Sequence, residues 1–349
     1  MTAPVSTATV GSGILVAPAV GPERPVAWPK RETRKLANGM QVVLAESHTF
    51  PKITAQLFFR SGNAVTALRA PGLADMTATV VRTATTNRDS RAIEEDLRRM
   101  GADLSTSAGA DTSAISIGGL AEAAEGMLGL VFDLAKNASF PADQFERERR
   151  QKIEELRIER TTPSFLASER FRKVLFGGHP YAVIAPSEEQ VASYRREDLE
   201  AYYRENYTPS NALLVVVGDF STPAMFALIE KAFGGWSAPA PAQLSGEAPP
   251  VNHGRHVHFV HLPGTVQTDV LVGNLAITRL DPDWMRLSLA NSIYGGAFNS
   301  RLIMNIREHK GYTYSPRSGA SALREHGYFS VHAAVRNDVV AASLTEIFY

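Results

Sequence analysis

Residues 294–318 read YGGAFNSRLIMNIREHKGYTYSPRS. The apolar spacing within this stretch predicts a helix over residues 299–309, followed by a strand over 312–320 that pairs with a strand over 327–335. Upstream we expect strands at 256–261 and 267–273 and a helix at 283–294, and downstream Asn337 and Asp338 begin another helix. The stretch therefore lies in a unit with the order β-β-α-α-β-β-α.

The same order is predicted in the first part of the chain. It comprises strands at 41–44 and 53–60, helices at about 72–84 and 91–100, strands at 102–109 and 112–119, and a helix at 121–136. The offset is 213 residues between Ile53 and Val266 and 215 residues between Asp111 and His326. A nearly constant offset indicates a duplicated module. In the first copy, further helices (141–160, 164–176, 196–205), a strand at 212–217 and a helix at 223–233 follow.

These patterns predict an α+β protein of tandem modules, each a mostly antiparallel sheet with helices packed on one face. We expect an extended or disordered lead-in at 1–30, a first module at 31–236, a linker rich in Pro, Ala, Ser and Gly at 237–255, and a second module at 256–349. The second copy has about 100 residues fewer than the first, so we expect the second module to be incomplete.

Composition excludes several classes of protein. The chain carries 36 basic and 36 acidic residues, which argues against nucleic-acid binding. It has no cysteine, which excludes disulfides, thiolate metal sites and cysteine nucleophiles. The longest apolar stretches, 14–20 and 213–217, are too short to cross a membrane. The sequence does not determine the compartment, but the absence of cysteine is compatible with a periplasmic or other extracytoplasmic location, which we favour over the cytoplasm.

Three segments together resemble the pitrilysin/insulinase family of inverted-motif zinc peptidases, which includes processing-peptidase subunits and respiratory core subunits. They are residues 35–51 (KLANGMQVVLAESHTFP) with 70–76 (APGLADM), residues 202–219 (YYRENYTPSNALLVVVGD), and residues 294–318. The resemblance extends from about residue 33 to the end of the chain. It implies the duplicated fold described above.

In active members of this family, an H-x-x-E-H helix binds zinc with two imidazoles, and its glutamate activates the bound water. The corresponding positions here are Asp75, Ala78 and Thr79. Glu155 matches the family's third ligand, a downstream glutamate, and Glu148 lies two turns earlier on the same helix face. Both glutamates also suit a solvated helix with i,i+4 ion pairs. The resemblance therefore implies degenerate zinc-site positions and no metal bound by this chain, because one carboxylate cannot complete a zinc site.

Active members also place an arginine and a tyrosine, seven residues apart in the second module, against the substrate backbone. Arg307 and Tyr314 have this spacing. A guanidinium offers several donors to peptide carbonyls, and a phenol can donate to a developing oxyanion. The residues alone favour a role for Arg307 at a helix C-terminus and for Tyr314 in a half-buried strand, and the family resemblance reverses this preference. Tyr312 projects to the same side of the predicted strand and is a second candidate.

Two further features carry weaker signals. The loop at 295–300 (GGAFNS) has the place of the glycine-rich loop in the non-catalytic processing-peptidase subunit, but it is short, and a Gly-Gly turn also suits a simple helix entry. His253, His256, His258 and His261 could form an adventitious metal site or an exposed surface. The remaining histidines show no ligand spacing.

The resemblance thus implies a non-catalytic subunit of a heteromeric zinc peptidase. A homologous partner would hold the zinc, this chain would supply Arg307 and Tyr314, and unstructured peptides would be the substrates. A purely structural or peptide-binding member without a protease partner, like the respiratory core subunits, is the alternative. An active peptidase with a rearranged metal site is disfavoured because Ala78 cannot act as a base.

Overall fold

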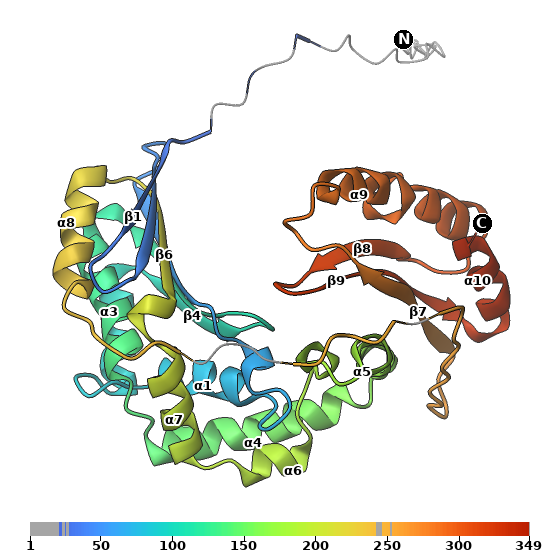
Figure 1. Ribbon diagram of the computed structural model, residues 1–349, viewed down its shortest axis with the longest axis horizontal. Helices are drawn as coiled ribbons and strands as arrows, with labels where there is room; N and C mark the ends of the chain where they lie inside the picture. The colour runs from blue at the N-terminus through green and yellow to red at the C-terminus, as the bar shows by residue number, and fades with distance from the viewer. Residues whose placement is uncertain (1–20, 23–24, 26–27, 242–245, 252, 349) are drawn as a thin grey trace, which may run out of the picture.

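The computed structural model describes residues 21–22, 25, 28–241, 246–251 and 253–348. Parts of the predicted lead-in and linker therefore lie outside the described residues. Two β-sheets stand on either side of an open gap, with α3 (Ala124–Asn137) and α8 (Thr222–Phe233) on the outer side of the first sheet and α9 (Trp284–Asn291) and α10 (Val340–Phe348) on the outer side of the second (Figure 1). The predicted α+β class is confirmed.

The first sheet has six strands, in the order β1 (Arg31–Lys35), β2 (Gln41–Glu46), β6 (Ala212–Gly218), β3 (Lys52–Phe59), β5 (Ser113–Leu120) and β4 (Asp103–Ala108). All its pairs are antiparallel except β2 with β6. On β3, the side chains of Ile53, Ala55, Leu57 and Phe59 are buried against the helices, as the alternation of apolar residues predicts. The other α-helices of this module are α1 (Leu73–Val81), α2 (Ser90–Met100), α4 (Ala142–Glu159), α5 (Pro163–Phe176), α6 (Glu188–Ser193) and α7 (Arg196–Asn206).

The second sheet has three strands, β7 (Gln267–Ala276), β9 (Gly327–Arg336) and β8 (Arg317–Ala322), paired antiparallel in that order. They correspond to β3, β5 and β4 of the first module. Two π-helical segments, η5 (Ser292–Gly296) and η6 (Ile303–His309), lie between α9 and β8. A separate apolar core joins this sheet to its helices, and it contains Val270, Leu302, Ile306, Val331, Ala333, Val335 and Ile347.

The strand expected at 256–261 is not formed, so that prediction was wrong. Its first-module counterpart, β2, is paired on one side with β1 and on the other with β6. The second module has no counterpart of β6 among the described residues, so the strand that would pair with this segment is missing. Val257 and Phe259 are accordingly 89% and 81% exposed. Conversely, β1 forms from the polar sequence RETRK, which carries no apolar alternation.

Contacts between two hairpin turns and α5 connect the modules. Asp111, in the β4–β5 turn, accepts hydrogen bonds from the Tyr181 hydroxyl (2.6 Å) and from the backbone N–H of Arg324 in the β8–β9 turn (2.8 Å). Beside them, the rings of Phe176 and Tyr328 meet edge to face in a small apolar cluster. The chain therefore holds its two modules together through complementary polar and apolar contacts. No helix of the described residues is both long and apolar enough to cross a membrane.

Candidate functional site

The positions equivalent to the family's zinc helix lie on α1. This helix starts after Gly72, whose φ of 77° is left-handed, and a Cβ there would lie 2.8 Å from the ring of Pro186. The close approach therefore requires glycine. The backbone N–H of Asp75 donates to the side chain of Asn63 (3.2 Å), which fixes the first turn of the helix beside the preceding loop.

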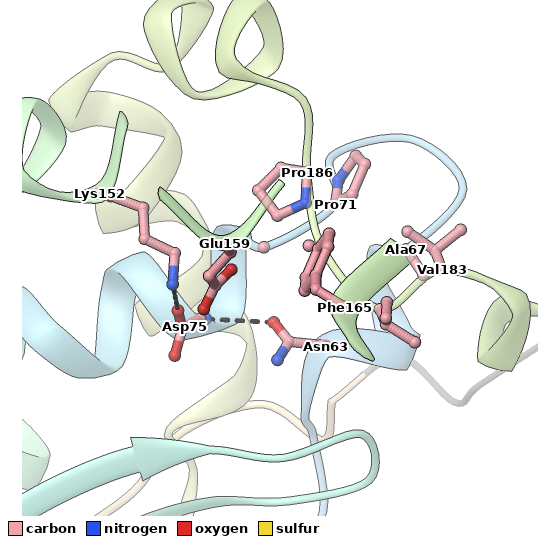
Figure 2. Close-up of a pocket in the computed structure, with 12 residues that line it drawn as sticks. Asn63, Ala67, Pro71, Asp75, Lys152, Glu159, Phe165, Val183 and Pro186 are labelled. Carbon is pink, nitrogen blue, oxygen red and sulfur yellow. Dashed lines mark hydrogen bonds and ion pairs between the residues drawn. The ribbon is translucent and has the colours of Figure 1, made fainter. Parts of the chain in front are cut away.

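A lysine ammonium lies among the carboxylates of this site. Lys152 of α4 places its Nζ 2.9 Å from Oδ2 of Asp75 (Figure 2). The same nitrogen lies 3.8 Å from Oε2 of Glu155. Burial by itself lowers the pKa of Lys152, but the charge of Asp75 and the hydrogen bond to it outweigh burial and raise that pKa above its usual value. Lys152 is therefore a cation, and it neutralises part of the acidic charge that a metal would otherwise meet.

The residues at this site do not fit zinc. Asp75 is engaged by Lys152, and the Thr79 hydroxyl donates to the backbone oxygen of Asp75 (3.0 Å). Ala78 contributes only a buried methyl group. Glu148 instead accepts a hydrogen bond from the neighbouring Arg147 (2.7 Å). The structure thus brings Asp75 and Glu155 together through Lys152, a residue that the sequence patterns did not single out, and leaves Glu148 apart.

A pocket of about 150 Å³ adjoins this ion pair. Its polar wall consists of Asn63, Asp75, Lys152 and Glu159, and Phe165 forms part of the apolar wall (Figure 2). The remaining lining residues are Ala67, Pro71, Gly72, Val183, Ile184, Ala185 and Pro186. The charged groups of the pocket are Asp75, Lys152 and Glu159, and no imidazole lines it, so it lacks the ligand set of a catalytic zinc site.

Arg307 and Tyr314 lie in contact in the second module. The guanidinium carbon of Arg307, on η6, lies 4.5 Å from the centre of the Tyr314 ring, which is 78% exposed. This is the geometry of a cation–π contact. The Nε of Arg307 is also 3.1 Å from Glu308. The pair therefore presents an exposed phenol beside a restrained guanidinium.

The expected strand at 312–320 starts later, at Arg317, so Tyr312 and Tyr314 lie in the loop before it. Pro316 directly precedes β8 and has no N–H for a ladder, and the Thr313 hydroxyl donates to the carbonyl of Ala334 (2.6 Å). The alternation rule consequently does not apply to the two tyrosines. Tyr312 packs against the second core, whereas Tyr314 is exposed. The expectation that both project to one side was wrong.

The histidines at 253–261 do not come together. His256 bonds to the carbonyl of His253 (2.8 Å), whereas His258 lies 3.0 Å from a guanidinium nitrogen of Arg170. In the part of the chain that the structure describes, only His179, Glu325 and His326 place three possible ligand atoms within 4.8 Å of one another. Residue spacing did not predict this group, because His179 lies far in the sequence from Glu325 and His326.

Hydrogen bonding identifies the His179 group as a contact between modules. The Nδ1 of His179 accepts the backbone N–H of Tyr181 (3.1 Å), so in the neutral ring the proton is on Nε2. That nitrogen faces the Glu325 carboxylate at 3.3 Å. In this tautomer neither ring nitrogen has a lone pair free for a metal. The group therefore connects the first module to the β8–β9 turn.

Acidification is expected to weaken this contact. Burial lowers the pKa of His179 below 6.5, and the nearby Glu325 opposes this effect only in part, while His326 adds to it. The folded state thus binds fewer protons than the unfolded state, so the free energy of unfolding should fall as the pH drops below about 6.5. Melting temperatures measured between about pH 5 and pH 7.5 should show a smaller slope for His179→Gln, which cannot be protonated. An unchanged slope in this variant would contradict the assignment.

Comparison with known proteins identifies the family. Residues 41–179 match the insulinase family (peptidase family M16), and residues 193–349 match the peptidase M16 inactive domain. The chain belongs to peptidase family M16, which confirms the resemblance noted from its motifs.

The relatives include proteins described as zinc proteases. The uncharacterized zinc protease YmxG of Bacillus subtilis is 23% identical over 84% of this chain and 71% of that protein. An uncharacterized zinc protease of Mycobacterium leprae is 29% identical over 59% of this chain and 46% of its own length, so the match spans about half of that relative. The crystal structure of a peptidase M16 inactive domain from Pseudomonas fluorescens superposes with a TM-score of 0.84 and 27% identity, covering 91% of this chain and 77% of the other.

Proposed function

We propose that this chain is a non-catalytic subunit of a heteromeric M16 peptidase. A homologous partner with an intact zinc helix would hold the metal and the general base. This chain would contribute Arg307 and Tyr314, which bind the main chain of the peptide substrate. The observation that carries the proposal is the contrast between the two modules: Lys152 pairs with Asp75 on the helix that corresponds to the zinc helix, yet Arg307 and Tyr314 remain in contact, with Tyr314 exposed.

Chemistry supports this division of roles. The guanidinium carries fixed N–H donors that suit carbonyl oxygens, and the Tyr314 hydroxyl is exposed next to it. Neither group cleaves a peptide bond alone, since no metal-ligand set lies beside them in the part of the chain that the structure describes. Both stabilise a bound peptide when the zinc and base come from elsewhere. Extended peptides are the substrates that such a site favours, because only an unfolded chain exposes its carbonyls for pairing.

Reconstitution tests the proposal. The chain is purified alone and together with a homologue that carries the complete H-x-x-E-H motif, and cleavage of an unstructured fluorogenic peptide is measured for each preparation. We expect a stable complex, cleavage that requires both chains, and loss of cleavage on chelation. A homologue that cleaves equally well without this chain would contradict the proposal. A complex that forms but is indifferent to Arg307 would favour the structural alternative.

A further inference from the structure

A second aromatic ring lies against Arg307. The guanidinium carbon is 5.3 Å from the centre of the Phe298 ring, in addition to its contact with Tyr314. Each ring contacts the guanidinium separately, and within the described residues no ring–ring contact joins Phe298 and Tyr314. The Arg307 side chain is only 25% exposed between them. Two aromatic contacts therefore restrain one cation.

The backbone holds Phe298 in this position. A Cβ on Gly295 would lie 2.5 Å from Leu302 and from Ser318, and a Cβ on Gly296 would lie 2.5 Å from Asn291. The two glycines thus let the last turn of η5 pack closely against its neighbours. A turn closed by the Ser300 N–H and the Ala297 carbonyl (3.0 Å) follows, and Phe298 projects from it with 69% of its surface exposed. The end of η5 is consequently a close-packed support for one aromatic side chain.

The two aromatic contacts leave the terminal N–H groups of the Arg307 guanidinium free to donate to a ligand. Aromatic rings cover faces of a guanidinium, whereas its N–H groups point outward in the plane of the group. Glu308 lies near Nε, and within the described residues the terminal nitrogens have no hydrogen-bond acceptor. A restrained guanidinium with two free terminal nitrogens is preorganised for oxygen acceptors, because less side-chain freedom is lost on binding.

We propose that Phe298 is a positioning residue for Arg307, which it holds ready to bind the main-chain oxygens of an extended peptide. An exposed phenylalanine alone would need no explanation. The contact with the guanidinium, the close-packed end of η5 beneath it and the free terminal nitrogens together support this role. The inference rests on the proposed function, because it assigns Phe298 a part in the same substrate-binding site.

The first test needs no partner and reads the Arg307 guanidinium directly. In the arginine-labelled chain, ring currents from Phe298 and Tyr314 should shift the Nε–Hε signal of Arg307 upfield. Phe298→Leu, which keeps an apolar side chain without a ring, should move this signal toward that of a solvated arginine. Phe298→Tyr should retain the shift. Both variants should melt like the parent because the side chain is exposed. An Arg307 signal that is identical in Phe298→Leu and the parent overturns the proposal.

The second test uses the reconstituted peptidase. Phe298→Leu should raise KM roughly two- to fivefold with little change in kcat, because it removes a restraint that favours ground state and transition state alike. Phe298→Tyr should restore the parental KM. A parental KM in Phe298→Leu, with Arg307→Ala strongly impaired, overturns the role of Phe298 and leaves the proposed function intact. Normal turnover in Arg307→Ala instead overturns the proposed function itself.

Discussion

Arg307→Ala should lower kcat/KM of the reconstituted peptidase by roughly 10- to 100-fold, because a hydrogen bond from a charged donor to a substrate carbonyl contributes about 1.5–3 kcal/mol. The expectation follows from geometry, since Arg307 is held against Tyr314 and has its terminal nitrogens free. Arg307→Lys should recover only part of the loss. It keeps the charge but lacks the planar group that stacks on an aromatic ring and offers paired donors.

Steady-state kinetics on an unstructured peptide provides the measurement, with complex formation checked by gel filtration. Tyr314→Phe is the matched control, because it keeps the ring that stacks on Arg307 and removes only the hydroxyl. Tyr314→Phe measures how far kcat/KM falls when only the hydroxyl is removed, and Tyr314→Leu how far it falls when the ring is removed as well. The difference between the two losses is the contribution of the ring contact with Arg307. Parental kcat/KM in Arg307→Ala, with the complex intact, would contradict the assignment.

Zinc binding should be recoverable in the first module, but only if Lys152 is also replaced. The Nζ of Lys152 touches both Asp75 and Glu155, so a cation at that place is within reach of ligands on both helices. The variant Asp75→His/Thr79→His adds two imidazoles one helical turn apart, and Glu155 completes a three-ligand set. While Lys152 remains, its charge opposes the metal by about 4 kcal/mol per unit charge at 4 Å and an effective dielectric constant of about 20.

The triple variant with Lys152→Met should therefore bind zinc at least about a hundredfold more tightly than the double variant that retains the lysine. Isothermal titration calorimetry measures both affinities. Lys152→Met alone is the control, because it removes the lysine from beside Asp75 and Glu155 without adding an imidazole. Equal zinc affinity in the double and triple variants would show that Lys152 does not occupy the metal position.

The sequence predicted the architecture well because the pattern repeats. Burial at Ile53, Ala55, Leu57 and Phe59 follows the strand alternation directly. The strand expected at 256–261 failed because a strand also needs a ladder partner, and alternation in one segment says nothing of the partner.

The candidate site was only partly predictable. The spacing of Arg307 and Tyr314 identified two residues that the structure places in contact. Lys152 carried no signal, since a lysine on a charged helix is indistinguishable from a solvated surface residue until Asp75 is placed beside it. Phe298 likewise looked like part of a helix-entry loop, and its role depends on a contact with η6. The group formed by His179 and His326 depends on how the modules dock.

Metal analysis of the purified chain tests the central claim most directly. The chain is incubated with excess zinc, dialysed, and assayed for bound metal and for cleavage of an unstructured peptide without any partner. Because Lys152 engages Asp75 and no imidazole is present on α1, we predict no stoichiometric zinc and no cleavage. One tightly bound zinc per chain, with peptide cleavage that a chelator abolishes, would contradict the account.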